Sequence, residues 1–244
     1  MKTLVIIPSR LSATRLPGKP LLKINGLSII SHVFKKALEA NIGEVYVATE
    51  DQEIIDDVQI NGGQAILTNR NHKTGTDRVY EAFQKIGKLD FELVMNLQGD
   101  EPLINTEDIK NLQTQMIDTK SKIGTLASKI ENKDFFQNQN IVKVITKEGF
   151  ENSKFPEALN FERKSDTLKE NTFHHLGIYC YQIETLKKFV SLNQSKNEIK
   201  NKLEQLRALD NNIKINVAYA NSTSIGVDTE EDFVAIKKIM EYKS

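Results

Sequence analysis

The order of apolar segments in residues 3–98 constrains the fold more than any other feature of this sequence. Four short runs rich in β-branched residues, from TLVIIP at 3–8 to LVMNLQ at 93–98, are separated by segments with helical spacing. Such alternation requires crossover connections, which are right-handed, and it builds a parallel sheet with helices on both faces. We therefore expect an α/β fold with a doubly wound, mostly parallel sheet, whose ligands bind at the carboxyl ends of the strands.

The strands follow one another more closely from about residue 123. The runs GTLASKI, NIVKVITKEG, ALNFER and FHHLGIYCY have no long helical pattern between them, which is typical of antiparallel pairing. A helix (LEQLRAL), a strand (KINVAYA) and a terminal helix (EEDFVAIKKIMEY) are expected after them. A chain of 244 residues can form one α/β domain with an added lobe. We expect residues 1–244 to be a single domain, with approximately 123–182 as a small antiparallel lobe.

Composition argues against several classes of protein. The 33 Lys and Arg residues balance 33 Asp and Glu residues, so the chain lacks the broad basic field that binds nucleic acid without sequence preference. The single cysteine, Cys180, rules out an internal disulfide and is expected in the core. No apolar run approaches the roughly 20 residues that a membrane span needs. We expect a cytoplasmic protein that binds neither nucleic acid nor membrane.

The loop after the first strand concentrates positive charge. Arg10, Arg15 and Lys19 lie close together in it, beside Gly18. Glycine lets the backbone approach an anion, and the three cations can neutralise a triphosphate. The loop matches neither the P-loop nor the dinucleotide-binding motif. It predicts a different kind of phosphate site, with a solvated basic turn as the alternative.

Two aspartates follow predicted strands at distant points in the chain. Asp100 lies in NLQGDEP after the fourth strand, and Asp228 lies in GVDTEED near the C-terminus. Carboxylates in such places suit a magnesium ion bound mainly through substrate phosphates. The alternatives are an ordinary Gly-Asp turn at Asp100 and a helix capping box formed by Thr229 and Asp232.

Other polar groups offer weaker signals. The segment NHKTGTDR at 71–78 could read the edge of a base, although an N-cap for the following helix explains it nearly as well. His174 and His175 are neighbours on a predicted strand, so only one of them can face a pocket. His32 lies on an amphipathic helix and is expected to be structural. No His or Cys cluster has zinc-ligand spacing, and no G-x-S-x-G motif occurs.

Six segments in order along almost the whole chain carry a resemblance: IPSRLSATRLPGKPL, NHKTGTDR, NLQGDEP, HLGIYCY, LEQLRAL and GVDTEED. Together they resemble the CMP-Kdo synthetases, the 3-deoxy-manno-octulosonate cytidylyltransferases. The resemblance implies a Rossmann-like nucleotidyltransferase fold and Mg²⁺-dependent transfer of CMP from CTP to the anomeric hydroxyl of 3-deoxy-D-manno-octulosonate (Kdo). Pyrophosphate would be released, and the product would serve lipopolysaccharide or capsule biosynthesis. It also implies a homodimer, and we expect the antiparallel lobe to be the contact.

The resemblance assigns roles to residues of this sequence. The catalytic residues that it implies are Arg10, Lys19, Asp100 and Asp228, with the two aspartates as the magnesium ligands. CTP would be bound by Arg10, Arg15, Lys19, Lys73, Thr74, Gly75, Thr76, Arg78 and Gln98. The sugar would be bound by Gln98, Arg163, His175, Glu204 and Gln205.

One stretch departs from the family pattern. The family usually continues from KEG and an aromatic residue into ALYFSRSPIP, whereas here KEGF is followed by ENSKFPE and then ALNFER. Aligning Arg163 with the family's sugar-binding arginine requires a short insertion and leaves the P-I-P segment absent. The sequence therefore leaves two alternatives for the sugar substrate: Kdo, or a modified acidic sugar such as 8-amino-Kdo or sialic acid. A non-catalytic nucleotide-binding relative is the alternative from another class, and the retained Arg10, Lys19, Asp100 and Asp228 argue against it.

Overall fold

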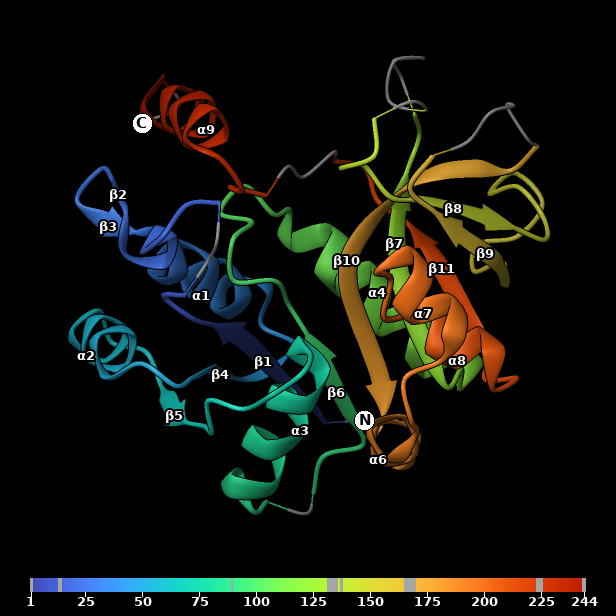
Figure 1. Ribbon diagram of the computed structural model, residues 1–244, viewed down its shortest axis with the longest axis horizontal. Helices are drawn as coiled ribbons and strands as arrows, with labels where there is room; N and C mark the ends of the chain where they lie inside the picture. The colour runs from blue at the N-terminus through green and yellow to red at the C-terminus, as the bar shows by residue number, and fades with distance from the viewer. Residues whose placement is uncertain are drawn as a thin grey trace. The chain divides into compact units, whose positions relative to one another are not determined.

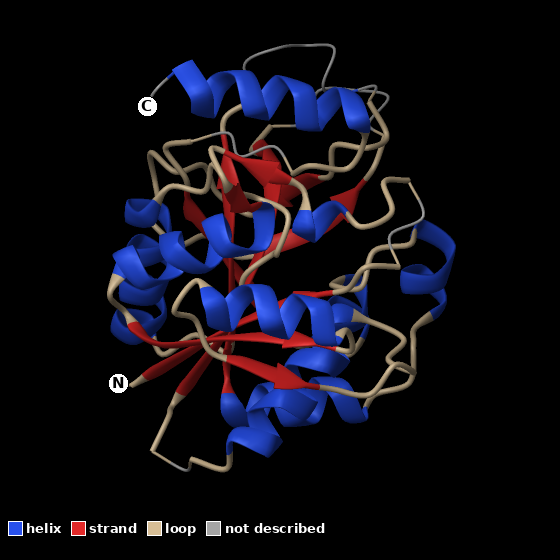
Figure 2. Cartoon of the chain, turned by 90° about the vertical axis from the view of Figure 1, so that its left-hand side faces the viewer, coloured by secondary structure: helices blue, strands red, loops and turns tan. Residues whose placement is uncertain are grey.

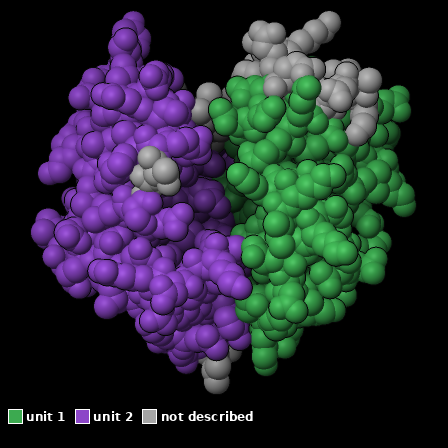
Figure 3. All heavy atoms as spheres, in the orientation of Figure 1, with its two compact units in different colours: residues 1, 110–223 green, residues 2–109, 224–244 purple. Residues whose placement is uncertain are grey.

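The computed structural model describes residues 2–12, 15–88, 90–130, 136, 138–164, 170–222 and 226–242. The chain divides into two compact units, coloured separately in Figure 3. Unit 2 consists of residues 2–109 and 224–244, and unit 1 of residues 110–223 with residue 1. The predicted lobe at about 123–182 falls within unit 1, and the single-domain organisation stays a prediction.

Unit 2 contains a parallel sheet built from the N-terminal strands. Its order is β6 (Leu93–Asn96), β1 (Thr3–Ser9), β4 (Gly43–Thr49) and β5 (Ala65–Leu67). The side chains from Leu4 to Ile7 on β1 are completely buried, as expected for a central strand covered on both faces. The chain moves outward from β1 to β5 and then returns to β6 on the other side of β1, which makes the sheet doubly wound.

Helices connect these strands. Right-handed crossovers put α1 (Ile29–Ala40) and α2 (Gln52–Ile60) on one face, and α3 (Gly75–Ile86) on the other. Figure 2 shows strands lying between helices in this way. Helix α1 begins after Ser28, whose hydroxyl accepts from the Ser31 N–H, and it is followed by Asn41 in the left-handed conformation.

The remaining elements of unit 2 support the loop after β1 and the C-terminal segment. They are the short 3₁₀ helix η1 (Lys19–Leu21), the hairpin β2 (Lys23–Ile24) and β3 (Leu27–Ser28), and α9 (Glu230–Tyr242). Figure 1 shows α9 beside this hairpin. Ile24, Ile29, Val227 and Ile236 form one buried cluster, so the residue next to Asp228 is anchored in a core.

Unit 1 is mainly antiparallel. Strand β10 (Thr172–Gln182) pairs with β7 (Ile123–Ser128) and β8 (Lys143–Thr146), and β8 pairs with β9 (Ala158–Glu162), all antiparallel (Figure 1). Strand β11 (Ile215–Tyr219) runs parallel to β7. The helices are α4 (Thr106–Thr119), which enters from unit 2, α6 (Ile183–Ser191), α7 (Lys196–Asn201) and α8 (Leu206–Asp210).

The prediction of an α/β fold with a mostly parallel sheet and a small antiparallel part is confirmed. The predicted helix over LEQLRAL is wrong in its first half: Leu203 to Gln205 form a turn, and α8 begins only at Leu206. Helix α7 ends at Asn201, and the next residue, Lys202, has a φ of 52°, so a new helix has to start after the chain has turned. Cys180 is completely buried, as expected. Among the described residues, no helix is both long and apolar enough to cross a membrane.

Candidate functional site

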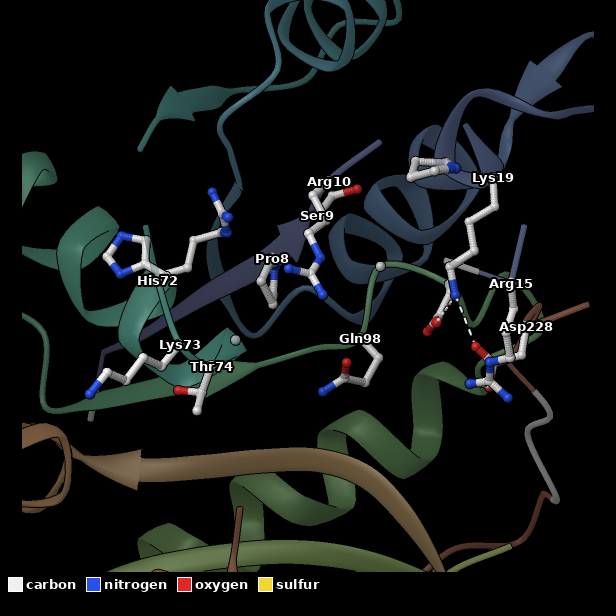
Figure 4. A pocket seen from close by; sticks show the side chains of 15 residues that line it. Pro8, Ser9, Arg10, Arg15, Lys19, His72, Lys73, Thr74, Gln98 and Asp228 are labelled. Atoms are coloured by element: carbon white, nitrogen blue, oxygen red, sulfur yellow. Dashed lines mark hydrogen bonds and ion pairs between the residues drawn. The ribbon is translucent and has the colours of Figure 1, made fainter. Parts of the chain in front are cut away.

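A cavity of about 390 Å³ opens in unit 2 at the carboxyl ends of β1 and β6. These two strands are neighbours, and the chain leaves them in opposite directions, so the cavity lies where a doubly wound sheet usually binds its ligand. Three loops and the C-terminal segment line it (Figure 4): Pro8, Ser9, Arg10, Arg15, Lys19, Pro20, His72, Lys73, Thr74, Gly75, Arg78, Gln98, Gly99, Asp100 and Asp228.

The two predicted aspartates converge on one ammonium group. Lys19 Nζ lies 2.6 Å from Asp100 Oδ2 and 3.1 Å from Asp228 Oδ1. It also donates to the Val227 carbonyl at 2.8 Å, and the Val227 N–H donates to the Asp100 carbonyl at 2.9 Å. Arg15 Nη2 lies 2.8 Å from the other oxygen of Asp228. The cluster thus combines two carboxylates with two cations.

The charges in this cluster support one another. Burial lowers the pKa of Lys19, but the nearby carboxylates of Asp100 and Asp228 raise it by more, so the ammonium stays charged. Carboxylate and carbonyl oxygens are also the ligands that hard divalent cations prefer. No group of three or more His, Cys, Asp or Glu side chains with metal-site geometry occurs in the described part of the chain. The residues therefore fit a metal ion that takes its other ligands from phosphate and water.

Glycines allow the loops to approach the strand ends. A Cβ atom on Gly99 would lie 2.9 Å from the Pro8 carbonyl oxygen, so only glycine lets the loop after β6 pack against the end of β1. Gly18 has a φ of 71° and precedes Lys19, and its N–H donates to the Leu11 carbonyl at 3.0 Å. Both glycines thus position groups that line the cavity.

Asp51 connects the start of α2 to the loop after β1. It occupies the N-cap position of α2, but its side chain makes no capping hydrogen bond. Its Oδ2 instead accepts from the Leu11 N–H at 2.7 Å. The carboxylate therefore tethers the cationic loop after β1, a long-range contact that no short motif signals.

The segment at 71–78 caps a helix and also lines the cavity. Thr74 and Asp77 form a capping box at the start of α3, with hydrogen bonds of 3.2 and 3.1 Å, which confirms the N-cap interpretation. Lys73, Thr74 and Gly75 also line the cavity. Figure 4 shows Lys73 and Thr74 at one end, Lys19 and Asp228 at the other, and Gln98 between them.

Two side chains of this segment are more buried than expected for residues that contact a ligand. Thr76 is 1% exposed and is not among the residues that line the cavity. Arg78 is 4% exposed and lines the cavity, but its guanidinium pairs with Glu50 and donates to the Thr68 hydroxyl at 2.6 Å. Its visible interactions join α3 to the ends of β4 and β5.

Glu81 binds residues of the segment before α3, a role that no sequence pattern signals. Its carboxylate accepts from the Asn69 N–H at 2.9 Å and from the His72 ring, and it forms an ion pair with Lys85. Burial raises the pKa of Glu81, but the bonds from Lys85, Asn69 and His72 lower it by more, to about 2. Glu81 thus anchors His72, which lines the cavity.

The predicted sugar residues other than Gln98 belong to unit 1. His175 is 7% exposed, and its Nε2 lies 2.9 Å from the Thr125 hydroxyl. Burial and the neighbouring His174 lower its pKa to about 3, so its ring is neutral near pH 7. His174 and His175 are both buried, next to an irregularity of β10 between Leu176 and Tyr179, and the expectation that only one of them faces a pocket stays a prediction.

Glu204 and Gln205 lie in the turn between α7 and α8. A buried ion pair braces this turn: Arg207 donates to both carboxylate oxygens of Glu198, at 2.9 and 2.6 Å. The Arg207 guanidinium also lies 4.7 Å from the centre of the Phe189 ring. The two predicted sugar residues are therefore carried by a rigidly held turn.

Arg163 makes three hydrogen bonds to backbone carbonyls. Its Nε donates to Asn201 at 3.2 Å, its Nη1 to Gln139 at 3.2 Å and its Nη2 to Lys202 at 3.0 Å. These bonds join the end of β9 to the end of α7. His32 makes a structural contact as expected, with Nε2 2.8 Å from the Ile24 carbonyl oxygen.

Comparison with known proteins decides the family. The family described as Cytidylyltransferase matches residues 4–215. A 3-deoxy-manno-octulosonate cytidylyltransferase from Thermodesulfovibrio yellowstonii is 43% identical, with 98% of each chain covered. The chain belongs to this family. A second 3-deoxy-manno-octulosonate cytidylyltransferase, from Rhodopseudomonas palustris, is 40% identical with the same coverage.

Solved structures agree with this cytidylyltransferase fold. A CMP:2-keto-3-deoxy-manno-octonic acid synthetase complexed with CTP is 34% identical and superposes with a TM-score of 0.90 over 100% of both chains. A UDP-glucose pyrophosphorylase is only 14% identical but has a TM-score of 0.75, which shows a shared fold alone. The sequence resemblance to the CMP-Kdo synthetases is confirmed.

Glu81→Gln in this cytidylyltransferase is expected to reduce stability in a pH-dependent way. Because the pKa of Glu81 is about 2 in the folded chain and 4.5 ordinarily, its contribution is present above pH 4.5 and is lost as the pH falls toward 2. Urea denaturation of wild type and Glu81→Gln should therefore show a difference in unfolding free energy that is constant from pH 6 to 7. This difference should become smaller below about pH 4.5. A gap that does not change with pH would contradict the assigned anchoring role.

Proposed function

We propose that this chain catalyses CMP transfer from CTP to the anomeric hydroxyl of Kdo, with release of pyrophosphate. The observation that carries the proposal is the convergence of Asp100 and Asp228 in a cavity that also holds Arg10, Arg15 and Lys19. The two named relatives and the CTP-bound structure support the choice of nucleotide and sugar.

The cavity residues suit displacement at the α-phosphate. Such a reaction needs charge neutralisation and in-line placement more than a covalent nucleophile. Arg10, Arg15 and Lys19 would neutralise the triphosphate, and Lys73, Thr74 and Gly75 would contact the cytidine at the other end. The buried Thr76 and Arg78 would hold that end of the site in place, and Arg78 also lines it.

Asp100 and Asp228 are proposed to hold Mg²⁺. Their carboxylates suit an ion that keeps its remaining positions for phosphate oxygens and water. When bound, Mg²⁺ would neutralise phosphate charge and lower the pKa of the attacking hydroxyl.

The sugar would be recognised by Gln98 together with Arg163, His175, Glu204 and Gln205. His175 would act as a neutral hydrogen-bonding group, because its pKa of about 3 prevents it from carrying charge near pH 7. Arg163 would use the N–H groups that do not bind backbone carbonyls to bind the sugar carboxylate.

Arg163→Ala is expected to raise the KM for the sugar by about tenfold or more, with a smaller effect on the KM for CTP. The loss of one charge-assisted hydrogen bond costs about 1.5–3 kcal/mol. Steady-state kinetics with each substrate varied in turn would measure both constants. Lys214→Ala, which removes an exposed ion pair to Glu157 in the same unit, is the control. Equal increases in both KM values for Arg163→Ala would contradict its alignment with the family's sugar-binding arginine.

A pyrophosphate-release assay tests the reaction itself. Purified protein, CTP and Mg²⁺ would be incubated separately with Kdo, 8-amino-Kdo and sialic acid. We expect turnover with Kdo. Preferred turnover of 8-amino-Kdo would correct the sugar, turnover of sialic acid alone would overturn the proposal, and no release with any sugar would favour a non-catalytic nucleotide-binding relative.

We also propose that the protein is a cytoplasmic homodimer whose product enters lipopolysaccharide or capsule biosynthesis. The exposed Leu159 on β9, within the predicted lobe at 123–182, supports a contact there. Size-exclusion chromatography with light scattering would measure the mass in solution, and Leu159→Asp should shift a dimer of this kind toward the monomer.

A further inference from the structure

Lys19 contacts the same oxygens that would bind a divalent cation. Its ammonium lies 2.6 Å from Asp100 Oδ2, 3.1 Å from Asp228 Oδ1 and 2.8 Å from the Val227 carbonyl oxygen. Its side chain is 13% exposed, against 28% for Asp100 and 41% for Asp228. Lys19 is therefore the least exposed side chain of the cluster, and its ammonium lies between the two carboxylates.

An ammonium and a metal ion cannot share this position. Magnesium binds oxygen at roughly 2.0–2.1 Å, so an ion bridging the same two carboxylates would fall almost on the Lys19 nitrogen. Two positive charges so close together repel strongly in a partly enclosed site. Lysine carries its charge on a flexible four-carbon stem, so it can leave without any change in the backbone. Lys19 and Arg10 line the same cavity, in which the phosphates of a bound nucleotide would offer the Lys19 ammonium other partners.

We propose that Lys19 is an exchangeable internal cation that couples metal binding to nucleotide binding. In the nucleotide-free protein it neutralises Asp100 and Asp228 and keeps the affinity for divalent metal low. The phosphates of the nucleotide then attract Lys19 away, and the two carboxylates become available to the metal. This inference rests on the proposed function, because it assumes that the cavity takes a metal and a nucleoside triphosphate.

Arg15 is a second cation beside Asp228, and its position shows why the proposed exchange with a metal ion is specific to Lys19. Among the described residues, the ion pair of Arg15 is with the second oxygen of Asp228, Oδ2, at 2.8 Å, and the Arg15 side chain is 55% exposed. It carries the same charge but does not lie between the carboxylates, so it can stay in place when Asp228 uses its other oxygen for a metal. A purely through-space charge effect would make the two cations equivalent, whereas direct competition singles out Lys19.

Binding of Mn²⁺ to the nucleotide-free protein, measured by electron paramagnetic resonance or calorimetry, tests the proposal. Lys19→Met is expected to tighten Mn²⁺ binding by about 5–150-fold, the usual range for coupled sites. Arg15→Gln should tighten it clearly less, and adding Asp100→Asn to Lys19→Met should remove the gain. Lys19→Gln provides a second uncharged side chain if the methionine variant folds poorly.

The outcomes separate this inference from the proposed function. Equal Mn²⁺ affinity in wild type and both Lys19 variants would overturn the exchange role, while metal-dependent turnover would leave the proposed function standing. Equal gains for Arg15→Gln and Lys19→Met would also overturn it, because charge alone would then explain the effect. Failure of every variant to bind Mn²⁺, together with turnover that needs no metal, would contradict both the inference and the proposed metal site.

Discussion

Asp100→Asn is expected to lower kcat by roughly 10²–10³-fold. The substitution keeps the shape of the side chain but removes one of two carboxylates assigned to the metal, and metal ions contribute several kcal/mol to stabilising charge in such transition states. Activity would be measured by pyrophosphate release at saturating CTP and sugar. The fold should persist, since Lys19 keeps its contacts with Asp228 and the Val227 carbonyl.

The control for this prediction is Asp118→Asn. Asp118 is an exposed carboxylate at the end of α4 that does not line the cavity, and its loss should leave kcat unchanged. Unfolding free energies of both variants should lie within about 1 kcal/mol of wild type. Near-normal turnover by Asp100→Asn would refute its assignment as a metal ligand.

Arg207→Ala is expected to reduce the unfolding free energy by about 3–5 kcal/mol. The side chains of Arg207 and Glu198 are only 3% and 4% exposed, so the substitution leaves a buried carboxylate without its main partner. The variant also loses the contact with the Phe189 ring. Urea denaturation monitored by circular dichroism would measure the change.

The pH dependence of this ion pair follows from its surroundings. Burial raises the pKa of Glu198, but bonds from Arg207, Gln194 and Ser195 lower it by more, below its ordinary value. The stabilisation is therefore present at neutral pH and is lost as acid protonates the carboxylate. The difference between wild type and Arg207→Ala should shrink accordingly in acid.

Lys214→Ala is the matched control for Arg207→Ala. Lys214 and Glu157 form an ion pair of similar length, 2.8 Å, but the lysine side chain is 71% exposed. Its loss should cost less than about 1 kcal/mol. An Arg207→Ala variant as stable as Lys214→Ala would show that the buried pair does not brace the turn that carries Glu204 and Gln205.

Local patterns were sufficient for most of the secondary structure. The strand at 3–8 and the helix from Ile29 are encoded by repeats over two to four residues, which depend only on the neighbouring chain. The capping boxes at Thr74 and Thr229 are local in the same way, and the structure contains both. The helix prediction for LEQLRAL was wrong in its first half because Lys202, just before it, adopts a left-handed backbone conformation that redirects the chain. Nothing in the sequence signals that conformation at a lysine.

Long-range pairing of polar groups depended on the tertiary structure. Asp51 stands at the N-cap position of α2, yet packing brings its carboxylate to the Leu11 N–H. Glu81 lies within α3, yet its carboxylate anchors His72. Arg163 looked like a ligand contact, and its observed partners are backbone carbonyls. In each of these contacts the two residues are at least nine positions apart in the sequence, which is farther than the repeat of a helix or a strand reaches.

By itself, the sequence determined the α/β class, the family and the identity of the groups at the strand ends, because periodicity and motif chemistry are properties of short segments. Only the tertiary structure decided that Asp100 and Asp228 meet, and that Lys19 is the cation between them. The reason is physical: the parallel pairing of β1 with β6 at the switch point and the core around Val227 bring together segments that share no local pattern.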